Sequence, residues 1–334
     1  MRPCGRDAQG PDRRGETSAG TVQQPGARIH AHAARLNPGG RTPEAATRRR
    51  DGGDTVTGST IGAAPLLQVS DVNVVYRGAG WRRPTFHALH DVSLDIRAGE
   101  TLGLVGESGS GKTTLGRAVL GLADVSSGSV SFDGDDITRA TRRTRRALSR
   151  DIQVVFQDPY SSLNPAMTVA SILAEPITAH GATRQEAAAR IAELLDQIGL
   201  EPDAGRRYPR EFSGGQRQRI AIARALALRP RLIVCDEPVS ALDLSTQARI
   251  LDLLIDIQVT TGVAYLFISH DLSVVRYISH RVAVMLDGQI LESGDGDKVT
   301  STPEHPYTQR LLLASPIPDP ARQAQRRHDY ANLA

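Results

Sequence analysis

The pattern of apolar and polar positions predicts alternating strands and helices from about residue 66 onward. Residues 66–76 and 88–96 alternate apolar with polar side chains, as half-buried antiparallel strands do. Helical stretches at residues 115–120, 245–259 and 271–278 alternate with short apolar runs that read as strands. Those runs lie at residues 101–105, 129–132, 152–156, 232–235, 264–268 and 282–286. The order predicts an α/β fold with a parallel-sheet core, preceded by an antiparallel β subdomain.

Residues 158–230 interrupt this alternation with a purely helical pattern. Helices are predicted at residues 168–180, at 184–198 and from about 214 to 228. The middle helix carries an apolar stripe typical of an amphipathic helix. Its members are Ile191, Leu194, Leu195 and Ile198. We therefore expect a helical insert, about residues 158–230, within the α/β core.

The first 64 residues differ from the rest in composition. They are rich in Gly, Pro, Arg, Thr and Ala and hold almost no large apolar side chains, so they bury too little surface to offset the entropy of ordering. We expect a disordered tail over residues 1–64, a folded domain over 65–320 and a short tail over 321–334. A start at Val56 stays open, because GTG can encode it and residues 52–54 can be encoded by GGAGGTGAC, which resembles a ribosome-binding site.

Charge is concentrated in that tail. The formal net charge of the chain is +3, whereas residues 1–60 hold ten arginines against six acids. The basic balance is therefore no argument for a nucleic-acid partner, and we expect none. A helix predicted at residues 138–150 also carries several arginines, which we interpret as a solvated face. They are Arg142, Arg143, Arg145 and Arg146.

Cysteine usage and hydropathy favour a reducing cytosol. The two cysteines, Cys4 and Cys235, are too few for a disulfide framework or a four-thiolate cluster. We interpret Cys235 as a small apolar strand residue rather than a reactive thiol. No apolar run approaches the ~18 residues of a membrane span, and the N-terminus lacks the apolar segment of a secretory signal.

A glycine-rich stretch, residues 106–114, joins the strand predicted at 101–105 to a helix, which is the context of a phosphate-binding loop. Glycines let backbone N–H groups turn toward phosphate oxygens, and the helix N-terminus adds positive potential. Lys112 would reach the β- and γ-phosphates of ATP, and the Thr113 hydroxyl would ligate Mg²⁺. Lys112 is one of only two lysines beside 38 arginines, and a compact ammonium fits where a planar guanidinium would not. The residues expected to bind nucleotide here are Gly106, Glu107, Ser108, Gly109, Ser110, Gly111, Lys112, Thr113 and Thr114.

Two acids, Asp236 and Glu237, end the apolar strand predicted at residues 232–235. A buried parallel strand delivers such residues to the carboxyl edge of the sheet, where α/β folds bind ligands. Asp236 would bind Mg²⁺ directly or through water. Glu237 is placed to polarise the attacking water as general base, with helix capping as its alternative role.

The third helix of the insert opens with Ser-Gly-Gly-Gln. Ser213 is a natural N-cap, and the amides that follow form a second anion-binding helix start. This sequence, between a phosphate loop and an Asp-Glu strand, resembles the signature of ABC-type ATPases, and the resemblance covers about residues 66–316. It implies a RecA-like core and an ATP site shared with a second ATPase subunit. The residues expected to face that second nucleotide are Ser213, Gly214, Gly215 and Gln216.

The resemblance also implies roles for residues outside these motifs. Tyr76 is similar to the aromatic residue that stacks on adenine. Gln157 is similar to the glutamine that contacts Mg²⁺ and water and senses the membrane partner. Residues 240–243 (Ser-Ala-Leu-Asp) resemble the loop that crosses the dimer interface. His270 resembles the histidine that contacts the γ-phosphate, so the expected catalytic set is Glu237, His270, Gln157 and Lys112.

Three further segments, residues 158–165, 305–308 and 316–320, resemble the ATPases of oligopeptide/dipeptide importers, most of all the second of that system's two ATPases. This implies an ATP-hydrolysing subunit on the cytoplasmic face of the membrane. Its partners would be two permease subunits, a second and different ATPase subunit and an external solute-binding protein. Nickel importers use similar subunits, so a nickel or other small-solute importer is the alternative. No cysteine follows Cys235, so we assign no iron–sulfur cluster.

Other ABC proteins fit this chain less well. Soluble ABC ATPases of DNA repair place long coiled-coil or zinc-binding insertions between phosphate loop and signature, whereas about a hundred residues without heptads or cysteine pairs lie there. Ribosome-associated relatives carry two cassettes, and a single phosphate loop is found here. A non-catalytic regulator would not need Glu237 and His270. The cargo itself is not readable from the sequence.

Overall fold

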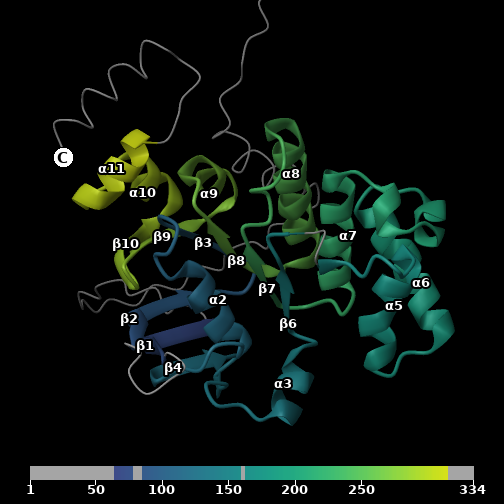
Figure 1. Cartoon of the computed structure of the whole chain (residues 1–334), viewed down its shortest axis with the longest axis horizontal. Coiled ribbons are helices and arrows are strands. Elements are labelled where there is room, and N and C mark those ends of the chain that lie inside the picture. Colours follow the sequence, from purple (N-terminus) through teal and green to yellow (C-terminus); the bar gives the residue numbers. More distant parts are fainter. Residues whose placement is uncertain (1–63, 78–84, 159–161, 315–334) are drawn as a thin grey trace, which may run out of the picture. The chain divides into compact units, whose positions relative to one another are not determined.

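The computed structural model describes residues 64–77, 85–158 and 162–314 (Figure 1). Every described residue belongs to one compact unit, within Thr57–Ala334. The predicted tail over residues 1–64, except for its last residue, and the alternative start at Val56 lie outside the described residues. So do Cys4 and the predicted tail over 321–334.

A six-stranded sheet forms the core, in the order β10-β9-β3-β8-β7-β6. Five strands are parallel, and β10 pairs antiparallel with β9 at one edge. The expected parallel core is therefore present, with one antiparallel edge strand that the sequence did not indicate. The strands are β3 (Thr101–Val105), β6 (Ile152–Val155), β7 (Leu232–Asp236), β8 (Ala264–Ser269), β9 (Arg281–Leu286) and β10 (Gln289–Asp295).

The central strands are buried on both faces, which explains their uninterrupted apolar sequences. Along β7, Leu232 and Val234 join one hydrophobic cluster, while Ile233 and Cys235 join the other. Cys235 is fully buried, as its interpretation as an apolar strand residue required, and burial raises the pKa of its thiol. The sheet is thus a rigid platform for the loops at its carboxyl edge.

A second, antiparallel sheet has the order β2-β1-β4-β5. Its strands are β1 (Leu67–Tyr76), β2 (Phe86–Ile96), β4 (Ser127–Phe132) and β5 (Asp135–Asp136). Apolar side chains of β1, β2 and β4 share a core cluster with α2 (Lys112–Leu120) and one face of the six-stranded sheet. Arg231, just before β7, also pairs with Asp133 after β4 at 2.6 Å.

Three helices occupy the stretch expected to form the insert: α5 (Val169–Ala179), α6 (Arg184–Gln197) and α7 (Gly214–Leu226). They pack on one another (Figure 1), with two short 3-10 helices, Pro202–Arg206 and Pro209–Glu211, between α6 and α7. Thr168, Thr183 and Ser213 cap their N-termini with side-chain oxygens. On α6, Leu194 and Leu195 of the predicted stripe are buried, and Ile198 is buried at the C-cap.

The basic helix predicted at residues 138–150 is shorter and only partly solvated. It is α3 (Arg142–Leu148), capped by Thr141. Arg142 is exposed, but Arg145 is not a solvated residue: its guanidinium donates to the backbone oxygens of Val119, at 3.1 Å, and Ile137. Val119 lies in the last turn of α2, whose carbonyls lack partners within the helix. Arg145 therefore caps α2 from outside.

The remaining helices are α8 (Leu244–Thr261), α9 (Leu272–Ile278), α10 (Gly296–Ser301) and α11 (Pro306–Ala314). The last two, like β10, were not predicted. In the described part of the chain, no helix combines the length and the apolar character needed to cross a membrane.

Candidate functional site

The predicted motifs gather at one edge of the six-stranded sheet because the strands that carry them run parallel. The glycine-rich loop follows β3, Gln157 follows β6, Glu237 follows β7 and His270 follows β8. These four strands are hydrogen-bonded neighbours in the order β3-β8-β7-β6. Their carboxyl ends therefore present the loops side by side, where ligands bind in α/β folds.

Two glycines of the phosphate loop are required by close backbone packing. A Cβ on Gly106 would lie 2.1 Å from the carbonyl oxygen of Met285 on β9. Gly111 has a φ of 105°, and a Cβ there would lie 2.8 Å from the oxygen of Ala88 on β2. The loop is thus held tightly against both sheets, and only glycine fits at these positions.

Lys112 lies within the loop that precedes it. Its ammonium donates to the carbonyl oxygens of Gly106, at 2.8 Å, and Glu107, at 2.7 Å, and to Ser110 Oγ at 3.3 Å. Burial lowers the pKa of Lys112, whereas the nearby carboxylates of Glu237, Asp236 and Glu107 raise it. The only positive side chain of the loop is therefore aimed into its concave side.

Thr113 and Asp236 meet at the base of the loop. The Thr113 hydroxyl donates to Asp236 Oδ1 at 3.1 Å. Burial raises the pKa of Asp236, the Thr113 hydrogen bond opposes this, and Glu237 adds to the rise. The described residues hold no group of three His, Cys, Asp or Glu side chains that could bind a metal alone. A hydroxyl beside one carboxylate does fit Mg²⁺, which takes oxygen ligands and keeps waters and substrate phosphates.

Glu237 is the centre of a polar cluster. Its Oε2 accepts from Gln157 Nε2 at 3.2 Å and lies 3.2 Å from His270 Nδ1. Gln157 also donates to Ser240 Oγ at 3.4 Å, and Ser240 Oγ donates to the Glu237 carbonyl oxygen at 3.1 Å. The backbone of Glu237 has a φ of 49°, and its N–H donates to Ile268 O at 3.0 Å. Side chains that follow β6 and β8 thus converge on the carboxylate that follows β7.

The Ser-Gly-Gly-Gln motif lies at the start of α7. Ser213 N–H donates to Gln216 Oε1 at 3.0 Å and Gln216 N–H donates to Ser213 Oγ at 3.3 Å, a reciprocal capping box. Gly214 is the first residue of the helix. A Cβ on Gly215 would lie 2.4 Å from Thr246 Cγ2, so α7 approaches the start of α8 closely there. Asp243, which caps α8, also belongs to the predicted interface loop.

Tyr76 is placed apart from these contacts. It ends β1, where it pairs in register with Phe86, and the residue is 41% exposed. No hydrogen bond among the described residues joins it to residues 106–114. Its accessibility suits a stacking surface, but its role stays a prediction.

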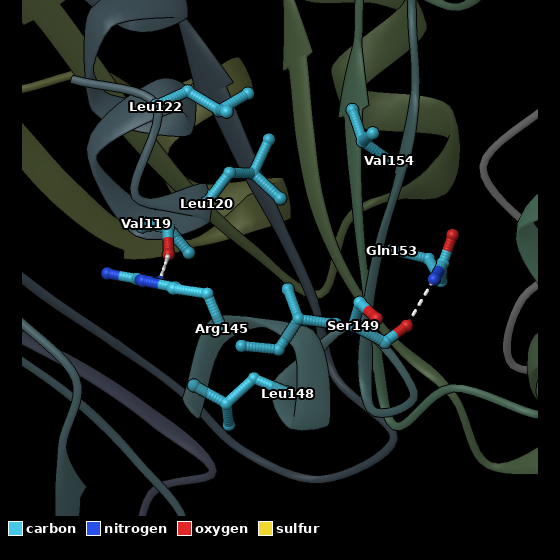
Figure 2. A pocket seen from close by; sticks show the side chains of 9 residues that line it. Val119, Leu120, Leu122, Arg145, Leu148, Ser149, Gln153 and Val154 are labelled. Atoms are coloured by element: carbon cyan, nitrogen blue, oxygen red, sulfur yellow. Dashed lines mark hydrogen bonds between the residues drawn. The ribbon is translucent and has the colours of Figure 1, made fainter. Parts of the chain in front are cut away.

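An apolar cavity of about 220 Å³ lies between α2, α3 and β6, and no sequence pattern indicated it (Figure 2). Figure 2 shows Leu120 and Leu122 from the α2 end opposite Val154 of β6. Leu122 is 65% exposed, and Phe156, two residues beyond Val154, is 40% exposed. The lining residues are Val119, Leu120, Leu122, Arg145, Leu148, Ser149, Ile152, Gln153 and Val154.

Sequence reasoning also missed two contacts on the outer side of the phosphate loop. The Glu107 N–H donates to the hydroxyl of Tyr307 on α11 at 3.2 Å. The Gly288 N–H, in the β9–β10 turn, donates to Ser110 O at 3.0 Å. Tyr307 belongs to the segment at residues 305–308, which the sequence offered only as a family resemblance.

These features define a P-loop ATPase of the α/β class, and comparisons with known proteins specify the family. A family model described as ABC transporter matches residues 89–240. A dimeric ATP-binding cassette, solved in a post-hydrolysis state with ADP and Pi, is 30% identical with a TM-score of 0.62. That match covers 69% of this chain and 98% of the cassette. The chain therefore belongs to the ABC transporter family, as an ATPase cassette.

Other relatives have names that describe transport. Glutathione import ATP-binding protein GsiA of Pectobacterium atrosepticum is 51% identical over 266 residues, which is 78% of this chain and 43% of the relative. Oligopeptide transport ATP-binding protein OppD of Mycobacterium tuberculosis is 55% identical over 236 residues, which is 71% of this chain and 39% of the relative. A solved structure of cbiO1 of Clostridium perfringens is 28% identical with a TM-score of 0.64, and the protein is part of the transporter complex cbiONQ. That match covers 75% of this chain and 96% of cbiO1. The chain spans less than half the length of the two curated relatives.

Proposed function

We propose that this chain is the ATP-hydrolysing subunit of an ABC importer for peptides. The observation that carries the proposal is the convergence of Gln157, Glu237 and His270 beside the loop that holds Lys112. The names of two relatives, an oligopeptide transport protein and a glutathione import protein, support a peptide cargo. An ATPase of such a system would work on the cytoplasmic face of the membrane.

Each residue of the site has a chemical task in this proposal. Lys112 binds the β- and γ-phosphates, while Thr113 and Asp236 hold Mg²⁺, which when bound neutralises phosphate charge. Glu237 takes a proton from the attacking water as general base. Because Gln157 and His270 both contact Oε2 of that carboxylate, we assign the water to Oε1. Gln157 and His270 fix the carboxylate, and His270 contacts the γ-phosphate.

Assembly completes the site. Ser213 lies at the start of α7, whereas the phosphate loop precedes α2. We propose that residues 213–216 face the nucleotide bound by a second, related but different ATPase subunit, and that Tyr76 stacks on the adenine of its own nucleotide. ATP held between two subunits stabilises the pair through differential binding.

A permease segment would use the apolar cavity between α2, α3 and β6. Leu122 exposes a large apolar surface at this cavity, and Phe156 immediately precedes Gln157. A cytoplasmic permease segment with an apolar side chain seated there would contact Val154, three residues before the Gln157 side chain that contacts Glu237. Two permease subunits and an external solute-binding protein complete the proposed system.

The test separates binding from hydrolysis. Glu237→Gln should keep ATP binding but lower kcat at least ~10²-fold, the scale of losing a positioned base. Lys112→Ala should instead weaken nucleotide binding, because it removes a charge held against phosphates. Both are measured in the assembled complex, with Lys298→Ala as the control lysine. Wild-type hydrolysis by Glu237→Gln would show that the base is assigned wrongly.

The shared site is tested by gel filtration of Glu237→Gln in MgATP, with and without the partner ATPase and permeases. A nucleotide-dependent shift that requires those partners is expected. Adding Ser213→Arg should abolish the shift while leaving ATP binding intact. Full-speed hydrolysis by a dilute monomer, unaffected by Ser213→Arg, would show that one chain holds a complete site.

A further inference from the structure

Helix α11 reaches the phosphate loop through one buried side chain. Tyr307 is only 4% exposed, and its hydroxyl accepts the hydrogen bond from the backbone N–H of Glu107 at 3.2 Å. The two residues are 200 positions apart in the sequence. The contact therefore ties the C-terminal end of the described chain to the second residue of the loop.

Tyr307 is itself held in place by the first turn of α11. Its N–H donates to His305 Nδ1 at 3.1 Å. Glu292, on β10, accepts from the backbone N–H groups of Glu304, at 2.8 Å, and His305, at 3.1 Å. A carboxylate at a helix start is a favourable partner for these amides. The edge strand β10 thus fixes the helix that carries Tyr307.

On the loop side, both backbone polar groups of Glu107, its N–H and its carbonyl, are hydrogen-bonded. The Glu107 N–H donates to Tyr307, while the Glu107 carbonyl accepts from Lys112 Nζ, at 2.7 Å, and from the Ser110 N–H, at 3.2 Å. Burial raises the pKa of the Tyr307 phenol, so it stays protonated at neutral pH although the Glu107 N–H bond opposes the rise. Without the tyrosine oxygen this amide would lack a partner, and the peptide could turn.

We propose that Tyr307 is a positioning residue for nucleotide binding, acting through the Glu107 backbone to keep the phosphate loop and Lys112 in the binding shape. This rests on the proposed function, because it assumes that the loop binds a nucleoside triphosphate. If the loop spends part of its time in another shape, apparent affinity falls by the fraction that remains competent. One lost hydrogen bond corresponds to an affinity loss of about two- to tenfold.

The experiment compares two tyrosine hydroxyls in the full chain. Tyr307→Phe removes the oxygen and keeps the ring, and Kd for MgATP is measured by titration calorimetry beside a thermal melt. The matched control is Tyr265→Phe. Tyr265 is fully buried, and its hydroxyl donates to Leu254 O at 3.1 Å, at the opposite end of β8 from the site. We expect Tyr307→Phe to raise Kd about two- to tenfold and the control to leave Kd unchanged, although both lower Tm.

A second variant distinguishes an effect through the Tyr307–Glu107 contact from a general loss of stability. Glu292→Ala removes the acceptor that fixes α11, so it should raise Kd in the wild-type chain but have less effect in the Tyr307→Phe background, because both act through the same contact. Equal Kd for wild type and Tyr307→Phe, or an equal rise in Tyr265→Phe, overturns the inference and leaves the proposed function standing. Failure of the wild type itself to bind MgATP would overturn both.

Discussion

Gly215 should be replaceable by alanine only if Thr246 becomes smaller. A Cβ at Gly215 would lie 2.4 Å from Thr246 Cγ2 but 3.7 Å from Thr246 Cβ and 3.9 Å from its Oγ1, so one methyl group causes the whole clash. Overpacking of this kind costs about 1–3 kcal/mol, and exchanging glycine for alanine returns about 0.4–1 kcal/mol through the unfolded chain. We therefore expect Gly215→Ala to lower the free energy of unfolding by about 1–2 kcal/mol.

Thr246→Ser deletes that methyl group and keeps the hydroxyl, which donates to Asp243 Oδ2 at 2.7 Å. In this background Gly215→Ala should be neutral or stabilising, so a double-mutant cycle from urea unfolding should give a coupling energy of about 1 kcal/mol or more. Because Gly215 lies in the segment assigned to a partner's nucleotide, hydrolysis in the complex should recover together with stability. Additive effects of the two substitutions would refute the close approach of α7 to α8.

Three further predictions concern buried polar groups. Because burial raises the folded-state pKa of Asp236 above its unfolded value, the ionised carboxylate costs stability that is restored as the pH falls through that pKa. Asp236→Asn should thus melt above wild type at neutral pH and lose that advantage as the pH falls through the raised pKa of Asp236, and a pH-independent difference would contradict this. Arg145→Met should cost about 1–3 kcal/mol in urea unfolding by leaving the Val119 carbonyl unpaired, whereas exposed Arg142→Met should stay within about 0.5 kcal/mol. Cys235 should escape alkylation in the native chain and react only after unfolding, as peptide mass mapping would show, because its buried thiol has a raised pKa.

The sequence predicted the elements whose apolar pattern is dictated by burial on two faces. Strands β3, β7 and β8 were placed within a residue or two, because continuous apolar runs have few alternatives. Strand β10 was missed because its seven residues, from Gln289 to Asp295, are half-buried or exposed and read as a polar loop. Its antiparallel pairing with β9 depends on a tight turn in which Asp287 and Gly288 both have positive φ.

The residues of the candidate site likewise fall into those predicted from local sequence and those that depend on long-range packing. Lys112, Asp236 and Glu237 were found from local motifs, whereas the roles of Gln157 and His270 came only from a family resemblance. Their convergence on Glu237 depends on the strand order β8-β7-β6, which the order along the chain does not specify. Arg145 was misread because an arginine run looks the same whether its side chains face water or a helix end. The segment that holds Tyr307 was recognised only as a family resemblance, and its contact with Glu107 was not predicted, since a contact across 200 positions leaves no local pattern.

At position 237, the side-chain length that the site needs and the residue types that the left-handed backbone favours are in conflict. Among the six non-glycine residues with positive φ in the described ranges, four are aspartates, whose short side chains tolerate this conformation. Aspartate would therefore suit the backbone at position 237, but it is one methylene shorter than the side chain that meets Gln157 and His270. Selection for hydrolysis must oppose a steady local preference for Asp, Asn or Gly. In a descendant that no longer hydrolyses ATP, Glu237 should be among the first residues to be replaced by Asp, Asn or Gly. The replacement should raise the free energy of unfolding.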